Sequence, residues 1–153
     1  MLDRASKAFF HFLAGSRTLK RVASRYGMRS PSSFVHRVIP GETVGDAIRA
    51  GRELEASGLM ATFDHLGENV SGLEAAAVAT REYLDVVAAI DAAGVSRNIS
   101  VKLSQLGIDT DRQAASDNLR TVLDATGPAG FFVRIDMESS HYTSVTLDIF
   151  ESL

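Results

Sequence analysis

The segment FFVRIDMESS, residues 131–140, is the most informative part of the sequence, because it combines a buried strand with charged side chains. Aromatic and β-branched residues follow a Gly-Pro-Ala-Gly loop, and two serines end the run. Successive side chains of a strand point to opposite faces, so one face is apolar and the other carries Arg134, Asp136 and Glu138. Charges on an interior face are costly unless they are paired or bind a ligand. This segment therefore predicts a polar site.

Two earlier segments, 59–68 and 98–107, repeat this pattern. Strands are predicted near 59–64, 98–103 and 131–137, and each is followed by a helical pattern. The helices are predicted over 71–93, from about 111 to 126 and from about 142 to the end of the chain. Strands that alternate with helices of this length predict an α/β fold with a parallel sheet and right-handed crossovers.

The polar face of each strand separates two α/β architectures. The central strands of an open, doubly wound sheet are apolar on both faces. Here one face of each strand carries polar groups: Thr62 and Asp64, Ser100 and Lys102, Arg134 and Asp136. No GxGxxG follows any strand, which argues against a Rossmann nucleotide site. The sequence therefore predicts N-terminal helices over 1–57 and, over 58–153, the first three βα units of a truncated (β/α)8 barrel, a fold that needs ~250 residues.

Helix-capping signals mark several of the predicted helices. Thr43 with Asp46 resembles a capping pair, and Gly58 and Gly94 suit the C-terminal ends of their helices. A capping box of Ser71 with Glu74 is predicted to open the long second helix. The apolar stripe of that helix includes Leu73, Ala77, Leu84, Val87 and Ile90, and that of the next helix Ala115, Leu119 and Val122.

Composition excludes several classes of site. The sequence has no cysteine, so disulfides, thiolate nucleophiles and cysteine-based zinc sites are excluded. The four histidines show no HExxH spacing, and an oxygen-ligated ion between Asp64 and Glu138 lacks a third ligand, so no metal site is predicted. No apolar run reaches the ~20 residues that span a bilayer.

The first thirty residues are strongly basic. Seven Lys and Arg stand there against Asp3, a charge of +6, so the remainder carries −9 of the net −3. We interpret this segment as a helical extension that packs on the domain, with a transit peptide, a nucleic-acid patch or a membrane-surface helix as alternatives. Peripheral contact with the inner face of the membrane is the preferred alternative. The predicted location is cytoplasmic, without a nucleic-acid partner.

The site of a βα-barrel lies at the carboxyl ends of its strands, which here hold Asp64 and Glu68, Lys102 and Gln105, and Asp136 with Met137 and Glu138. Neighbouring strand ends therefore predict an acid–lysine–acid cluster of Asp64, Lys102 and Asp136. A lysine between two carboxylates stays protonated. Lys102 therefore suits anion binding better than Schiff-base chemistry, which needs a lowered lysine pKa. A purely structural charge network is the alternative, and it has more weight for Arg134 and Glu138.

Three segments together resemble the first three βα units of proline dehydrogenase, most closely the bacterial single-function form: GLMATFDHLGENV, NISVKLSQLG and FFVRIDMESSHYTSVTLDIF. The basic N-terminal helices and the helix after residues 40–43 resemble that family's entry segment. The resemblance implies an oxidoreductase of proline catabolism that binds FAD, a nucleotide cofactor. It would oxidise L-proline to Δ1-pyrroline-5-carboxylate by hydride transfer to FAD and pass the electrons to a membrane quinone.

The resemblance also implies roles for four residues. Lys102 matches a lysine that holds the substrate carboxylate. Asp136 matches a catalytic aspartate beside the substrate that orders the lysine. Met137 matches a residue next to the flavin, and Glu68 a glutamate that pairs with an arginine of the last helix to gate the site.

The family's remaining flavin- and carboxylate-binding groups come from later strands, which this sequence lacks. We therefore expect this chain to be an incomplete fragment that binds FAD poorly and is inactive alone. Two alternatives are a non-catalytic half-barrel that serves as an interaction module and another barrel lyase or aldolase that uses Lys102 covalently.

Overall fold

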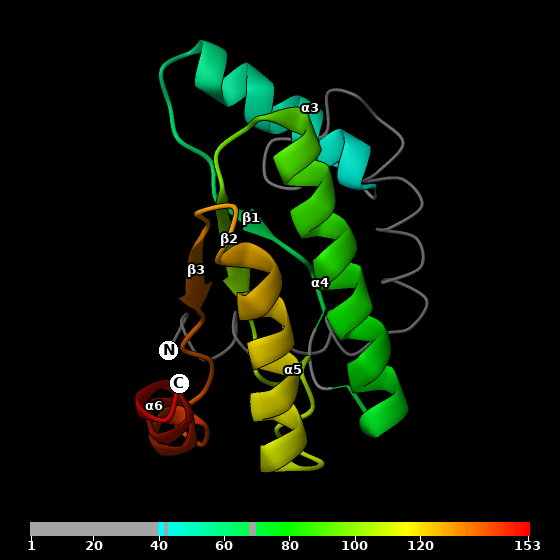
Figure 1. Ribbon diagram of the computed structural model, residues 1–153, viewed down its shortest axis with the longest axis vertical. Coiled ribbons are helices and arrows are strands. Elements are labelled where there is room, and N and C mark those ends of the chain that lie inside the picture. Colours follow the sequence, from blue (N-terminus) through cyan, green and yellow to red (C-terminus); the bar gives the residue numbers. More distant parts are fainter. Residues whose placement is uncertain (1–39, 42, 68–69) are drawn as a thin grey trace, which may run out of the picture. The chain divides into compact units, whose positions relative to one another are not determined.

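The computed structural model describes residues 40–41, 43–67 and 70–153. The predicted helices before residue 40 and the predicted gate residue Glu68 lie outside these ranges. The chain divides into two compact units, Met1–Asp46 and Ala47–Leu153. The described elements are, in chain order, α3 (Val44–Ala56), β1 (Phe63–Asp64), α4 (Leu73–Ala93), β2 (Asn98–Val101), α5 (Arg112–Thr126), β3 (Phe132–Ile135) and α6 (Thr143–Glu151) (Figure 1).

The three strands form one parallel sheet in the order β1-β2-β3, as predicted. The register pairs Asp64 with Ser100, and Ser100 with Arg134. All three strands are shorter than predicted, and β1 has only two residues. One reason is that the Leu59 amide donates to Leu54 O, 3.0 Å away, to close α3 and is therefore not available to the sheet.

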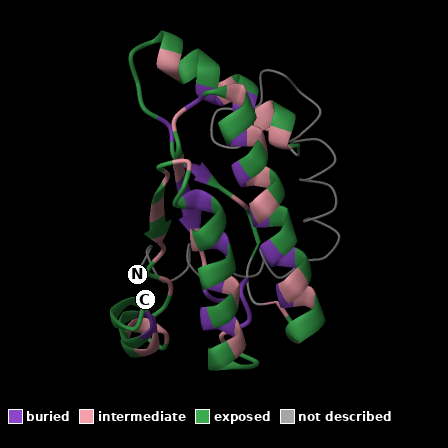
Figure 2. Cartoon of the chain, in the orientation of Figure 1, coloured by how far each residue is buried: buried purple, intermediate pink, exposed green. Residues whose placement is uncertain are grey.

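The hydrophobic core lies between the apolar face of the sheet and the facing stripes of α4 and α5 (Figure 2). Ile99, Val101 and Leu103 are buried on the predicted apolar face of the second strand segment. The predicted stripe of α5 is confirmed, since Ala115, Leu119 and Val122 are all buried. In α4, Val87 and Ile90 are buried as predicted, but Leu73 in the first turn is 49% exposed, and Tyr83 belongs to the buried stripe instead.

Three of the predicted helix caps are confirmed and one is wrong. Thr43 and Asp46 cap each other's backbone amides, at 3.2 and 3.3 Å, and Gly58 and Gly94 adopt left-handed conformations with φ of 77° and 66°. The predicted capping box of Ser71 with Glu74 does not form, because the chain enters α4 through Gly72 at φ 93°, with no side-chain cap. Asp111 caps α5 by accepting from the amides of residues 113 and 114.

The C-terminal helix is shorter than predicted. α6 ends at Glu151 rather than running on to the end of the chain. The Ser152 hydroxyl donates to Ile149 O, 2.8 Å away, and so satisfies a carbonyl that a further helical turn would use.

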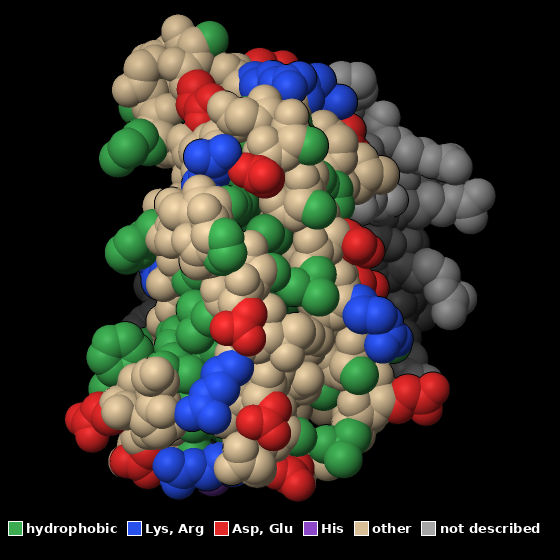
Figure 3. Space-filling view, in the orientation of Figure 1, with side chains coloured by type: hydrophobic (Ala, Val, Ile, Leu, Met, Phe, Trp, Pro, Cys, Tyr) green, Lys and Arg blue, Asp and Glu red, His purple; other side chains and the backbone are tan. Residues whose placement is uncertain are grey.

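The outer surface of α4 and α5 carries acidic and basic side chains interspersed with one another (Figure 3). Arg97 pairs with Asp91 at 2.7 Å, and Arg112 of α5 with Asp148 of α6 at 3.2 Å. Exposed pairs of this kind add little stability. None of the helices in the described ranges is long and apolar enough to cross a membrane.

Candidate active site

Asp64, Lys102 and Asp136 lie together at the carboxyl edge of the sheet, where the three strands end. The Lys102 Nζ donates to both oxygens of Asp64, at 2.9 and 2.7 Å, and lies 3.5 Å from Asp136 Oδ2. The other oxygen of Asp136 accepts a 2.9 Å hydrogen bond from Ser100 Oγ. The parallel register brings these residues together, because the Asp136 amide continues the ladder to Val101 O at 2.9 Å. The predicted acid–lysine–acid cluster is therefore present.

The cluster favours a charged lysine. The Lys102 side chain is only 13% exposed. Burial by itself lowers the pKa of Lys102, but the hydrogen bonds and charges of Asp64 and Asp136 outweigh burial, so the net pKa is raised. Lys102 is therefore an ammonium at neutral pH, which suits it to hold a carboxylate and opposes Schiff-base chemistry.

Glu138 links the segments that follow β2 and β3. Its carboxylate accepts hydrogen bonds from the Ser104 backbone amide, at 3.0 Å, and from the Ser104 hydroxyl. Ser104 is fully buried, so these bonds are shielded from water. Glu138 thereby ties the end of β3, and with it Asp136, to the loop after Lys102. This is a structural contribution to the site, one of the two readings that the sequence leaves open for Glu138.

The contacts of a second hydrogen-bond network, next to the cluster, were not predicted from the sequence. Tyr83 in α4 contacts Lys102 and Gln105, and Gln105 contacts His65. Its signals in the sequence are a tyrosine four residues before Val87 on the buried stripe of α4, and a glutamine close after a buried strand. Neither signal names the partner, because the contacts join residues about 20 to 40 positions apart.

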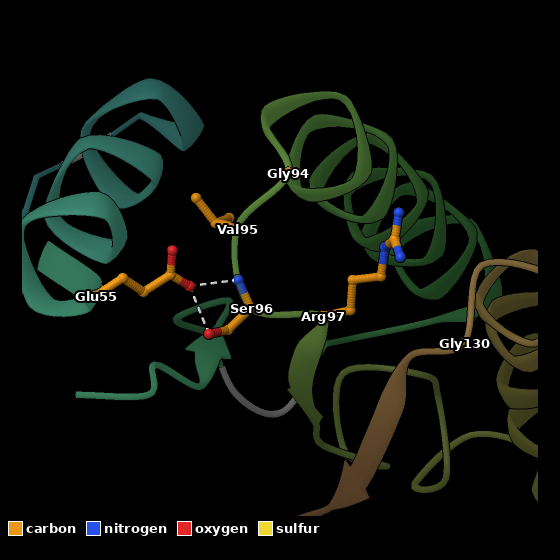
Figure 4. A pocket seen from close by; sticks show the side chains of 6 residues that line it. All are labelled: Glu55, Gly94, Val95, Ser96, Arg97 and Gly130. Atoms are coloured by element: carbon orange, nitrogen blue, oxygen red, sulfur yellow. Dashed lines mark hydrogen bonds between the residues drawn. The ribbon is translucent and has the colours of Figure 1, made fainter. Parts of the chain in front are cut away.

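A surface hollow lies at the opposite, amino edge of the sheet. It measures about 520 Å³ and is lined by Glu55, Gly94, Val95, Ser96, Arg97 and Gly130 (Figure 4). Its polar groups are already engaged: Glu55 accepts from the amide and hydroxyl of Ser96, and Arg97 turns away to Asp91. The carboxyl edge is therefore the better candidate site.

Comparison of the chain with known proteins identifies its family. The family model described as "Proline dehydrogenase" matches residues 47–153. The chain belongs to the proline dehydrogenase family. It is 32% identical over 146 residues to proline dehydrogenase 2 of Bacillus subtilis (strain 168), which covers 95% of this chain and 47% of the relative. It is 31% identical over 141 residues to proline dehydrogenase 1 of the same strain, covering 92% and 46%. The chain thus spans about half the length of these curated relatives.

A solved structure shares the fold. The matched chain is proline utilization A (PutA) from Bdellovibrio bacteriovorus, inactivated by N-propargylglycine. The TM-score is 0.66 at 22% sequence identity, and the match covers 75% of this chain and 14% of that chain. The α/β arrangement described above is therefore one that occurs within a larger protein.

The structure locates three of the four residues to which the proline dehydrogenase resemblance assigns a role. Lys102 and Asp136 lie in the cluster, and Met137, directly after Asp136, is 54% exposed. Glu68 lies outside the described residues. Within residues 40–41, 43–67 and 70–153, no group of three His, Asp or Glu side chains is placed to hold a metal ion.

Proposed function

We propose that the protein formed by these βα units oxidises L-proline to Δ1-pyrroline-5-carboxylate with FAD as hydride acceptor. The observation that supports it is the lysine paired with two carboxylates at the carboxyl edge of the sheet, in a member of the proline dehydrogenase family. The proposal concerns the complete (β/α)8 barrel to which three strands contribute here.

The cluster is chemically complementary to a zwitterionic amino acid. The Lys102 ammonium can donate a charge-assisted hydrogen bond to the substrate carboxylate. Asp136 can accept from the substrate N–H through Oδ2, since its Oδ1 is occupied by Ser100. Asp64 keeps Lys102 charged and oriented. Two opposite charges 3.5 Å apart thus match the two charged groups of L-proline.

The oxidation removes a hydride from a ring carbon and a proton from the neighbouring nitrogen, which leaves a C=N bond. Bound FAD supplies the ring that accepts the hydride. In this proposal Asp136 holds the substrate N–H and takes up its proton, and Lys102 keeps the carboxylate end in place.

The described residues fit only part of FAD. The exposed Met137 offers an apolar contact for a flat ring beside Asp136. The phosphates need free cations or backbone amides, whereas Lys102 is paired with Asp64 and the Ser104 amide with Glu138. In this proposal the phosphates are held by other parts of the barrel. A membrane quinone as electron acceptor and contact of the basic segment 1–30 with the membrane belong to the same proposal.

The test is the visible absorbance of the purified holoenzyme during anaerobic addition of L-proline. We expect the flavin bands to bleach, and Lys102→Met to require at least tenfold more proline, because a charged hydrogen bond contributes about 1.5–3 kcal/mol. Arg112→Met removes an exposed cation that pairs with Asp148 and not with the cluster, and it is the matched control. A flavoprotein that proline leaves fully oxidised would overturn the proposal, as would a borohydride-trapped substrate adduct on Lys102.

A further inference from the structure

A buried polar bridge lies next to the acid–lysine–acid cluster and joins the segments that follow β1 and β2. It consists of Tyr83 from α4 and Gln105 from the loop after β2, which are 1% and 2% exposed. The Tyr83 oxygen accepts the Lys102 backbone N–H at 3.3 Å and contacts Gln105 Oε1. The Gln105 amide nitrogen lies 3.2 Å from His65 O.

The chemistry of the partners determines each donor and acceptor in this bridge. The carbonyl of His65 can only accept, so the NH₂ group of Gln105 points to it and Oε1 points to Tyr83. Tyr83 must then donate its own proton to Gln105 while it accepts from Lys102 N. Burial, the largest cause, raises the pKa of Tyr83, so the phenol keeps this proton. His65 Nδ1, 3.3 Å from the same NH₂ group, is left as an acceptor.

Both ends of the bridge attach next to the ion pair. At one end the backbone N–H of Lys102 itself donates to Tyr83, and at the other the accepting residue, His65, directly follows Asp64. The bridge is closely packed on the side of Gly67, where an added Cβ would lie 2.5 Å from Gln105 Nε2. Because both ends are bonded to backbone groups, a displacement of the bridge would break or lengthen its bonds to the segments that carry Asp64 and Lys102.

We infer that Tyr83 and Gln105 are positioning residues. They set the separation of the Asp64 carboxylate and the Lys102 ammonium through the backbone segments that carry these two side chains. Phenylalanine and leucine would fill the same space without any polar atom to satisfy. Burying a phenol and an amide is costly unless they are hydrogen-bonded, and here each bond that they make lies beside the cluster. The consequence for catalysis rests on the proposed function, whereas the geometric role does not.

The experiment compares Tyr83→Phe and Gln105→Leu with a matched control in the holoenzyme. The control is Thr80→Val, one turn earlier on α4, which removes a buried hydroxyl that donates within its own helix, to Ala76 O at 2.8 Å. Thermal unfolding establishes that all three variants fold.

The first readout is trace acetylation by acetic anhydride, measured by mass spectrometry. Residues 1–153 contain three lysines, Lys7, Lys20 and Lys102, and the ratio of Lys102 to Lys20 labelling is read from their peptides within one sample. Acetic anhydride attacks the neutral amine, so a loosened ion pair raises the ratio. We expect a rise of about threefold or more in Tyr83→Phe and Gln105→Leu, and no change in Thr80→Val. An unchanged ratio in both variants, or an equal rise in the control, would overturn the inference.

The second readout is proline oxidation, with kcat and KM measured separately. We expect KM to rise more than kcat falls, because Lys102 holds the carboxylate. If the wild-type holoenzyme does not oxidise proline, the proposed function fails, and the labelling ratio still decides whether the bridge positions Lys102.

Discussion

Lys102 forms its closest ion pair with Asp64, whose two carboxylate oxygens lie 2.9 and 2.7 Å from the Lys102 ammonium nitrogen. Asp136, which the family resemblance presents as the residue that orders the lysine, lies farther away at 3.5 Å. The two carboxylates therefore differ in how closely they contact Lys102. Asp64 makes the closer contacts to the lysine, whereas Asp136 accepts from Ser100 through one oxygen and lies 3.5 Å from Lys102 through the other.

This unequal contact predicts different effects for Asp64→Asn and Asp136→Asn. Replacing Asp64 removes two short, charge-assisted contacts to Lys102, whereas replacing Asp136 removes one longer contact. We expect trace acetylation of Lys102, relative to Lys20, to rise about tenfold in Asp64→Asn, and by less in Asp136→Asn.

Asp148→Asn is the control for this comparison, because it breaks an exposed pair with Arg112 and leaves the cluster intact. Equal labelling in the two cluster variants would show that Lys102 has no preferred partner. On the proposed function, Asp136→Asn is nevertheless the more damaging change for kcat, since Asp136 takes up the substrate proton.

The raised pKa of Lys102 predicts a loss of stability in alkali. The unfolded chain releases this proton near the ordinary value of 10.5, whereas the folded chain keeps it to a higher pH. The contribution is thus fully present below pH 10.5 and is lost as pH rises through the folded pKa, at up to about 1.4 kcal/mol per pH unit.

Tyr83 and Tyr142 also have raised pKa values, the first through burial and the second through its hydrogen bond to Asp109, so they titrate in the same direction. The measurement is therefore a difference. The free energy of unfolding in urea is compared between wild type and Lys102→Met from pH 9 to 11.5. We expect the wild type to lose more stability above pH 10.5; parallel curves would show that Lys102 gains nothing from its partners on folding.

Glu138→Gln is predicted to weaken the fold at the end of β3. The glutamate accepts two hydrogen bonds from the buried Ser104, and an amide can accept only through its single oxygen. One Ser104 donor is left facing an NH₂ group, so we expect a loss of about 1–2 kcal/mol in the free energy of unfolding. Glu53→Gln on the exposed side of α3 is the matched control and should be near neutral. A loss no larger than that of the control would contradict the structural role of Glu138.

Local chemistry explains what the sequence could predict. The alternation of Ser100 and Lys102 with Ile99 and Val101 is a property of consecutive residues, and it correctly assigns the two faces of β2. The parallel register then follows from the alternation of helices and strands. Three neighbouring strand ends suffice to bring the cluster together, which is why Lys102, Asp64 and Asp136 were predicted as a group.

The parts that were missed depend on contacts between distant segments or on a single backbone angle. Tyr83 reads as one more apolar position of α4, because its hydroxyl finds Gln105 and Lys102 only in the folded chain. The capping box at Ser71 has the right spacing, but Gly72 at φ 93° starts the helix without it. The hydrophobic periodicity of the sequence predicts neither the partners of Tyr83 nor the backbone angle of Gly72.

Gly67→Ala is predicted to destabilise the protein through Gln105 alone. Without that contact, an alanine in place of glycine usually stabilises by about 0.4–1 kcal/mol, by reducing the freedom of the unfolded chain. Here the new Cβ would lie 2.5 Å from Gln105 Nε2, and Gln105 cannot withdraw without breaking its bonds to His65 and Tyr83. We expect a loss of about 1 kcal/mol in the wild type and neutrality or a gain in a Gln105→Ala background, measured as a double-mutant cycle by urea unfolding. Gly45→Ala, whose Cβ would lie no closer than 3.8 Å to Thr43 Oγ1, reports the effect of the substitution without a clash. If Gly67→Ala lowers the free energy of unfolding equally in both backgrounds, Gln105 is free to move and the bridge next to Lys102 is not rigid.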